Sequence, residues 1–171
     1  YKLNLRPQLA SGRRSNMVFL GQHFLVNKAA INKIIAALDS QKNETVVEIG
    51  PGRGALTLPL AKQCQNPNFK CQIIAIEKDP QLAQKLSENF QIITGDALKI
   101  LPNLVWKLKI GNWKLVGNIP YYITGKLLRI LSELENKPQL SVLTIQKEVA
   151  ERIAAKPPKM NLLAAAVQIW A

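Results

Sequence analysis

Hydrophobic residues along this chain follow two alternating patterns, short continuous runs and stretches with helical spacing. Residues 45–49, Thr-Val-Val-Glu-Ile, form a β-branched run that stops at a glycine, which predicts a buried strand. An apolar repeat at helical spacing over residues 31–38 follows Asn27, a favourable N-cap, and predicts a helix that ends near Asp39. The same patterns predict further helices over residues 55–64, 80–89, 124–134 and 148–154, a helical turn near 97–101, and strands over residues 71–77, 90–94, 113–117 and 139–146.

This alternation of strands and helices is typical of an α/β fold with a doubly wound, mostly parallel sheet. Ligands of such sheets bind beyond the carboxyl ends of the strands. The chain of 171 residues shows no internal repeat, low-complexity stretch or linker. We therefore expect a basic lead-in over residues 1–20 and one domain over residues 21–171, with a loop at residues 155–159.

The charge of the chain is strongly positive and unevenly distributed. Lysine and arginine number 23 against 11 aspartate and glutamate residues, a formal net charge of +12 at pH 7. Residues 1–38 and 97–132 contain several basic residues and no acidic one. This pattern favours a polyanionic partner, most often nucleic acid, over the alternative of a basic face that only serves solubility.

Composition also excludes some classes of protein. No apolar run approaches the roughly 18 residues of a membrane-spanning helix, and no secretory signal is visible. The start at Tyr1 in place of a methionine predicts that the chain is a fragment, and we separately expect a cytoplasmic location. Cys64 and Cys71 match no common zinc spacing, so we expect two reduced thiols and no metal site.

The first motif with chemical potential is a glycine-rich loop that follows the strand at residues 45–49. Gly50 and Gly52 allow the backbone to approach a ligand, and the next helix offers its positive N-terminal end. Glu77 ends the following strand, where a carboxylate can accept hydrogen bonds from both ribose hydroxyls of an adenosine-containing cofactor. NAD and S-adenosylmethionine both remain candidates for this cofactor. The G-x-G-x-G spacing after Glu48 favours S-adenosylmethionine, the methyl donor.

Two further strand ends carry polar residues. Asp96 can accept a hydrogen bond from an adenine amino group, or cap the helix that follows it. Asn118 opens the turn Asn-Ile-Pro-Tyr, in which its side-chain carbonyl and the backbone carbonyl of Ile119 can both bind an aromatic amine. These bonds would turn the nitrogen lone pair toward a methyl donor, Pro120 would stiffen the turn, and Tyr121 could stack on an extruded base. A purely structural turn is the alternative.

Taken together, these motifs resemble those of the ribosomal RNA adenine dimethyltransferase family, in particular its small-subunit branch. The resemblance runs from about Gly21 to Gln168. It rests on residues 21–25 (Gly-Gln-His-Phe-Leu), 48–52 (Glu-Ile-Gly-Pro-Gly), 76–79 (Ile-Glu-Lys-Asp), 95–98 (Gly-Asp-Ala-Leu), 118–121 (Asn-Ile-Pro-Tyr) and 146–152 (Gln-Lys-Glu-Val-Ala-Glu-Arg).

The resemblance implies a Rossmann-like class I methyltransferase that dimethylates adenines of small-subunit rRNA, free or in a precursor ribosomal particle. It implies Asn118, Pro120 and Tyr121 as catalytic residues and S-adenosylmethionine as cofactor, without metal or membrane. The cofactor-binding residues that it implies, together with those inferred above, are His23, Leu25, Gly50, Gly52, Glu77, Asp96 and Asn118.

The end of the chain and two alternative functions keep other interpretations open. The chain stops at Ala171, where the family continues with further strands and a helical domain, so we expect an incomplete sheet with an unpaired edge. A ribosome-assembly or transcription factor without turnover is one alternative. The other is a large-subunit rRNA methylase that confers antibiotic resistance, although residues 146–152 argue against it. The oligomeric state cannot be predicted from these patterns.

Overall fold

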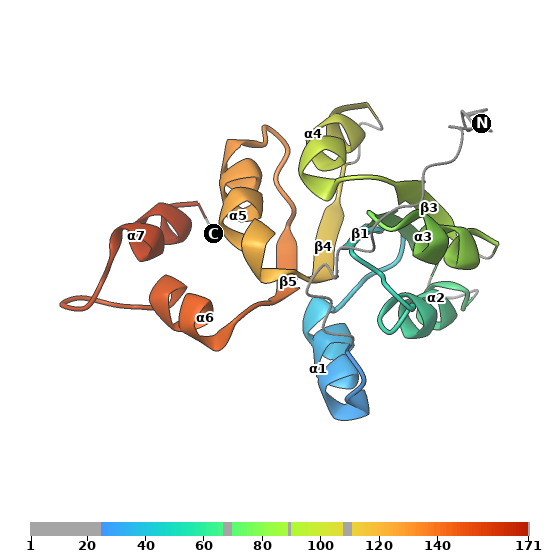
Figure 1. The fold of residues 1–171 in the computed structure, drawn as a ribbon, viewed down its shortest axis with the longest axis horizontal. Coiled ribbons are helices and arrows are strands. Elements are labelled where there is room, and N and C mark those ends of the chain that lie inside the picture. Colours follow the sequence, from blue (N-terminus) through green and yellow to red (C-terminus); the bar gives the residue numbers. More distant parts are fainter. Residues whose placement is uncertain (1–24, 67–69, 89, 108–110, 171) are drawn as a thin grey trace, which may run out of the picture.

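The computed structural model describes residues 25–66, 70–88, 90–107 and 111–170, and within them the chain forms one parallel sheet (Figure 1). Its strand order is β3-β2-β1-β4-β5, and every neighbouring pair is parallel. The α/β doubly wound fold expected from the sequence is therefore confirmed. The strands are β1 (Thr45–Ile49), β2 (Gln72–Glu77), β3 (Gln91–Thr94), β4 (Trp113–Asn118) and β5 (Leu140–Thr144).

Helices cover both faces of this sheet. Side chains of α1 and α2 pack with β1 and β4 in one apolar cluster, and those of α4 and α5 pack with β1, β2 and β4 in a second one. Figure 1 shows α6 and α7 extending past β5 at the edge of the sheet. The helices are α1 (Lys28–Leu38), α2 (Thr57–Cys64), α3 (Pro80–Ser87), α4 (Ala97–Lys107), the 3-10 helix η1 (Tyr121–Ile123), α5 (Thr124–Glu133), α6 (Lys147–Ile153) and α7 (Leu162–Gln168).

Local sequence signals account for several helix ends. The Asn27 side chain accepts a hydrogen bond from the Ala30 amide at 3.1 Å, and Asp39 ends α1 in a left-handed conformation. Asp79 caps α3 in the same way, with Pro80 in the first turn. The boundaries predicted for α1 and α3 follow from these caps.

Two local expectations were wrong, and one further helix was missed. The helical turn near residues 97–101 is an 11-residue helix that continues past Pro102, because Leu104 and Val105 beyond the proline are buried against the sheet. Helix α7 was not predicted at all. Cys64 and Cys71 are joined in a disulfide with Cα atoms 4.8 Å apart, instead of being two reduced thiols. The disulfide links the end of α2 to the residue before β2, two segments that the parallel pairing of β1 and β2 brings together.

Candidate active site

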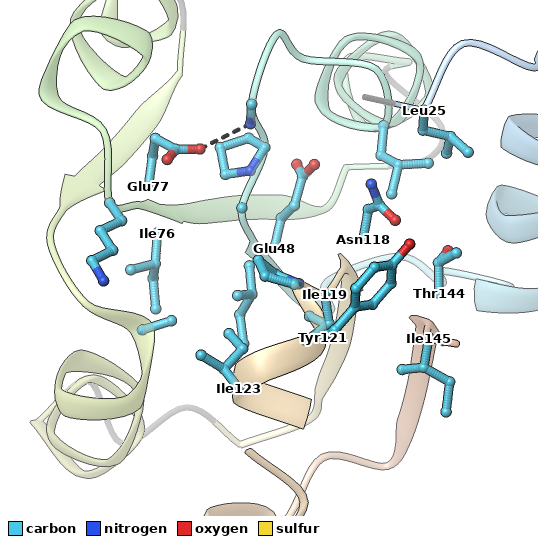
Figure 2. A pocket seen from close by; sticks show the side chains of 18 of the residues that line it. Leu25, Glu48, Ile76, Glu77, Asn118, Ile119, Tyr121, Ile123, Thr144 and Ile145 are labelled. Carbon is cyan, nitrogen blue, oxygen red and sulfur yellow. Dashed lines mark hydrogen bonds between the residues drawn. The ribbon is translucent and has the colours of Figure 1, made fainter. Parts of the chain in front are cut away.

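A cavity of about 680 Å³ opens at the carboxyl edge of the sheet, within the usual size of small-molecule sites (Figure 2). It lies where the sequence predicted a site, because parallel strands deliver all their carboxyl ends to one edge. Most of the predicted site residues line it, whereas His23 lies outside the described residues. The predicted residues in its wall are Leu25, Gly50, Gly52, Glu77, Asp96, Asn118, Pro120 and Tyr121.

The glycine loop after β1 is held by the carboxylate at the end of β2. Gly50 and Gly52 have φ values of 68° and 57°, in the left-handed region that favours glycine. The Gly52 amide donates to Glu77 Oε2 at 2.9 Å, the bond drawn in Figure 2, and the Asp79 amide donates to Glu77 Oε1 at 2.9 Å. Glu77 is only 2% exposed. Each oxygen keeps a second lone pair, so this fixed carboxylate can still accept a bond from a ligand.

Glu48 entered the sequence reasoning only as part of the glycine-loop motif, and no binding role was predicted for it. Its side chain is 1% exposed, and its Oε2 atom has no hydrogen-bond partner in the described part of the chain. Burial raises the pKa of Glu48 from 4.5 to about 7; the nearby Thr57 lowers this pKa in part, and the negative charge of Glu77 raises it further. Thr57 therefore offsets only part of the cost of burying this carboxyl group. A single acid within an apolar strand just before the glycine loop was the available signal.

Asp96 follows β3 at the far side of the cavity. One of its carboxylate oxygens, Oδ1, accepts a bond from the Leu98 amide at 2.9 Å. The structural interpretation of Asp96 as a cap for α4 is therefore confirmed. Because Asp96 also lines the cavity, a contact from its second oxygen to an adenine amino group stays a prediction.

The turn that carries Asn118 is fixed by its surroundings. The Ile119 amide donates to the Thr144 carbonyl of β5 at 3.1 Å, and the Ile119 side chain is 2% exposed. The Ile123 amide donates to the Pro120 carbonyl at 3.1 Å, which closes η1. Figure 2 shows the Asn118 amide and the Tyr121 ring among the side chains that line the cavity. Tyr121 is 49% exposed, as a ring that meets an incoming base would need to be.

The chemistry of the cavity wall favours a ligand that donates hydrogen bonds or carries a positive charge. Three carboxyl groups, those of Glu48, Glu77 and Asp96, stand at the ends of three neighbouring strands. Two of them are buried, and hydrogen-bond donors or a positive charge on the ligand would relieve their desolvation. The described residues contain no group of three metal-ligating side chains, and none of their helices is long and apolar enough to span a bilayer.

Comparisons with known proteins agree with this chemistry. The family model described as "Ribosomal RNA adenine dimethylase" matches residues 13–171. A "Ribosomal RNA small subunit methyltransferase A" from Dehalococcoides mccartyi is 42% identical over 157 residues, which cover 88% of this chain and 52% of that protein. A protein of the same name from Koribacter versatilis is 37% identical and is matched over 96% of this chain and 63% of its own length. The chain thus spans little more than half the length of these relatives.

Two solved structures share the fold. A dimethyladenosine transferase from Plasmodium falciparum superposes with a TM-score of 0.71 at 28% identity, covering 86% of this chain and 52% of that one. The 23S rRNA methyltransferase ErmE superposes with a TM-score of 0.61 at 28% identity, covering 76% and 50%. The described residues therefore share their Rossmann-like fold with a dimethyladenosine transferase and a 23S rRNA methyltransferase.

Proposed function

Because the chain belongs to the ribosomal RNA adenine dimethylase family, we propose that it transfers methyl groups from S-adenosylmethionine to the exocyclic amine of adenines in small-subunit rRNA. Two transfers to each amine would give dimethyladenosine. The observation that carries the proposal is the position of the Asn118 turn in the wall of a cavity that also contains the buried Glu48 carboxyl group, one oxygen of which is unpaired.

The residues of the cavity fit the proposed cofactor. Glu77, already oriented by two amides, would accept bonds from the ribose hydroxyls, and Asp96 from the adenine amino group. The unpaired oxygen of Glu48 supplies negative charge for a ligand that is cationic at its methionine end. Gly50, Gly52 and Leu25 give the loop and the wall against which the ligand packs. When bound, S-adenosylmethionine supplies a methyl group that is already strongly electrophilic.

The proposed catalytic role of the turn is to aim the nucleophile. An adenine amine is a weak nucleophile because its lone pair is delocalised into the ring. The Asn118 side-chain carbonyl and the Ile119 backbone carbonyl would accept both amine hydrogens and favour a pyramidal nitrogen. Pro120 limits movement of these acceptors, and Tyr121 would stack on the base once it has left its helix. Because positioning carries most of the catalysis, the proton released from the methylated amine can pass to solvent without a dedicated base.

We propose that the substrate is the RNA of the small subunit or its precursor particle. The named relatives from bacteria and residues 146–152 support this over a large-subunit target, although ErmE shares the fold. The cytoplasmic location and the domain limits expected from the sequence stay predictions, and the lead-in over residues 1–20 lies outside the described residues.

The experiment is transfer of labelled methyl groups to immature small ribosomal subunits, with the digested nucleosides separated by mass. We expect dimethyladenosine with the unaltered chain and a loss of at least about 100-fold in Asn118→Ala, because the aimed acceptor is gone. Asn112→Ala is the matched control, since Asn112 is exposed at the opposite end of β4. Equal dimethylation by Asn118→Ala and Asn112→Ala would contradict the catalytic role of the turn. RNA binding without any transfer would favour the assembly factor.

A further inference from the structure

Helices α4 and α5 form one layer on the same face of the sheet, and their outer side is unusual in composition. The inner residues of both helices belong to one apolar cluster, and the two helices also contact each other. Their outward side chains are mostly polar and include one large aromatic ring. The outer face consists of Lys99, Asn103, Trp106 and Lys107 on α4, and Lys126, Arg129 and Glu133 on α5.

If the basic residues of this face served only solubility, an exposed Trp106 would have no explanation. Its side chain is 74% exposed, whereas Trp113 in the neighbouring strand β4 is completely buried. Trp106 lies seven residues after Lys99, so both point away from the core on one side of α4, about 10 Å apart along the helix. An indole between cations is the usual arrangement for stacking an unpaired base while phosphates are held on either side.

The charge of this face is positive with little internal compensation. No acidic residue occurs between residues 97 and 132. Glu133 follows, and it pairs with Arg129 at 2.8 Å. Lys99, Lys107 and Lys126 form no ion pair with any residue in the part of the chain that the structure describes.

Both helices of this face begin next to the candidate active site. Ala97, the first residue of α4, lines the cavity, and α5 begins directly after η1, which carries Tyr121. From the rim of the cavity the face extends along α4 for about 15 Å, the rise of roughly ten helical residues. Nucleotides that flank a base held at the rim would cross this distance in two or three steps.

We propose that the outer face of α4 and α5 is an RNA-docking surface, in which Trp106 stacks on an unpaired base while Lys99, Lys107 and Lys126 hold phosphates. This inference rests on the proposed function, because it assigns the part of the molecule that holds RNA beside the target adenine. The surface acts on the affinity for RNA and leaves the binding of the methyl donor unchanged.

The test measures binding of a single-stranded RNA oligonucleotide by tryptophan fluorescence and by its dependence on salt. We expect Trp106→Ala to bind about five-fold or more weakly and to lose the quenching that RNA causes, whereas Trp106→Phe keeps part of the affinity. Lys99→Glu with Lys107→Glu should reduce the slope of log affinity against log salt by more than one. Lys62→Glu with Lys85→Glu is the matched control, because it makes the same charge change on exposed positions of α2 and α3.

The same variants in the methyl-transfer assay separate this inference from the proposed function. We expect a higher KM for ribosomal particles, with an unchanged kcat and an unchanged affinity for the methyl donor. RNA affinity, quenching and KM equal to those of the control would overturn the docking surface even if dimethylation is observed. Failure of dimethylation by the unaltered chain would overturn the proposed function, while the binding measurements would still decide whether this face holds RNA.

Discussion

Replacing Glu48 by glutamine should have opposite effects on two quantities: it should raise the stability of the fold at high pH and lower the affinity of the site for a cationic ligand. Burial raises the pKa of this carboxyl group from 4.5 to about 7, so the native state prefers its protonated form. Between pH 4.5 and 7 the folded chain holds more protons than the unfolded one, and stability therefore falls as pH rises. Below pH 4.5 both states are protonated, and the penalty is absent. Above pH 7 the penalty is complete and amounts to about 3 kcal/mol.

Glu48→Gln removes the ionisation and keeps the size of the side chain. Without ligand, we expect the variant to match the original chain near pH 4.5 and to be more stable by up to about 3 kcal/mol at pH 8. Urea unfolding at the two pH values measures this difference. A variant that is equally destabilised at both pH values would refute the argument that burial of the charge dominates.

The affinity for a cationic methyl donor should rise with pH, whereas the stability of the fold falls. With a pKa of about 7, Glu48 is roughly 10% ionised at pH 6 and half ionised at pH 7, so donor affinity should rise about five-fold over this interval. Glu48→Gln should bind the donor more weakly, and its affinity should not rise over this interval. Because the donor itself also titrates, the variant measured at the same pH values serves as the control for that effect. Calorimetry gives both affinities. An identical pH profile in the variant would refute the electrostatic role of Glu48.

Three other substitutions test the geometry around the site. Gly117→Ala would place a Cβ atom 2.7 Å from a carbonyl oxygen of β1, so we expect a loss of about 1–3 kcal/mol in urea unfolding and reduced methyl transfer. Tyr122 and Lys78 both line the cavity, and the Lys78 ammonium lies 5.9 Å from the centroid of the Tyr122 ring. Tyr122→Ala should therefore weaken donor binding about two- to five-fold, whereas Tyr122→Phe, which keeps the ring, should not. Equal donor affinity in both variants would show that the contact is irrelevant. The nearly buried Glu44 carboxylate lies 3.1 Å from Lys114 Nζ. Lys114→Met should lower the free energy of unfolding by about 3–5 kcal/mol, because it leaves this carboxylate without its cation. Adding Glu44→Gln should restore much of the loss.

The sequence was informative wherever a local rule decides the structure. The β-branched run of β1 could only be a buried strand, and the caps at Asn27 and Asp79 fixed two helix starts. The position of the site followed from topology, because parallel strands place their polar ends at one edge. These rules require only neighbours in the chain or the general geometry of a parallel sheet.

Features that depend on contacts between distant segments could not be predicted. The raised pKa of Glu48 requires its complete burial by other elements, which its place in β1 alone does not reveal. The extension of α4 past Pro102 depends on apolar contacts with the sheet that offset the missing backbone hydrogen bond. The exposure of Trp106 also needs the structure, because a tryptophan in a helix is usually expected to belong to the core.

Glu77 illustrates why a site of this kind is formed before any ligand arrives. Its two oxygens already accept the amides of Gly52 and Asp79, so the carboxylate holds the glycine loop of β1 against the end of β2. The same orientation presents its remaining lone pairs to the cavity, and a ligand that uses them spends no free energy on ordering the side chain. Removing Glu77 would leave the partly buried Gly52 amide unpaired and disturb the loop together with the ligand contact. Glu48→Gln keeps the size of the side chain, and its effect on folding depends on pH in a way that unfolding measures directly, so its effect on ligand binding can be separated from its effect on folding.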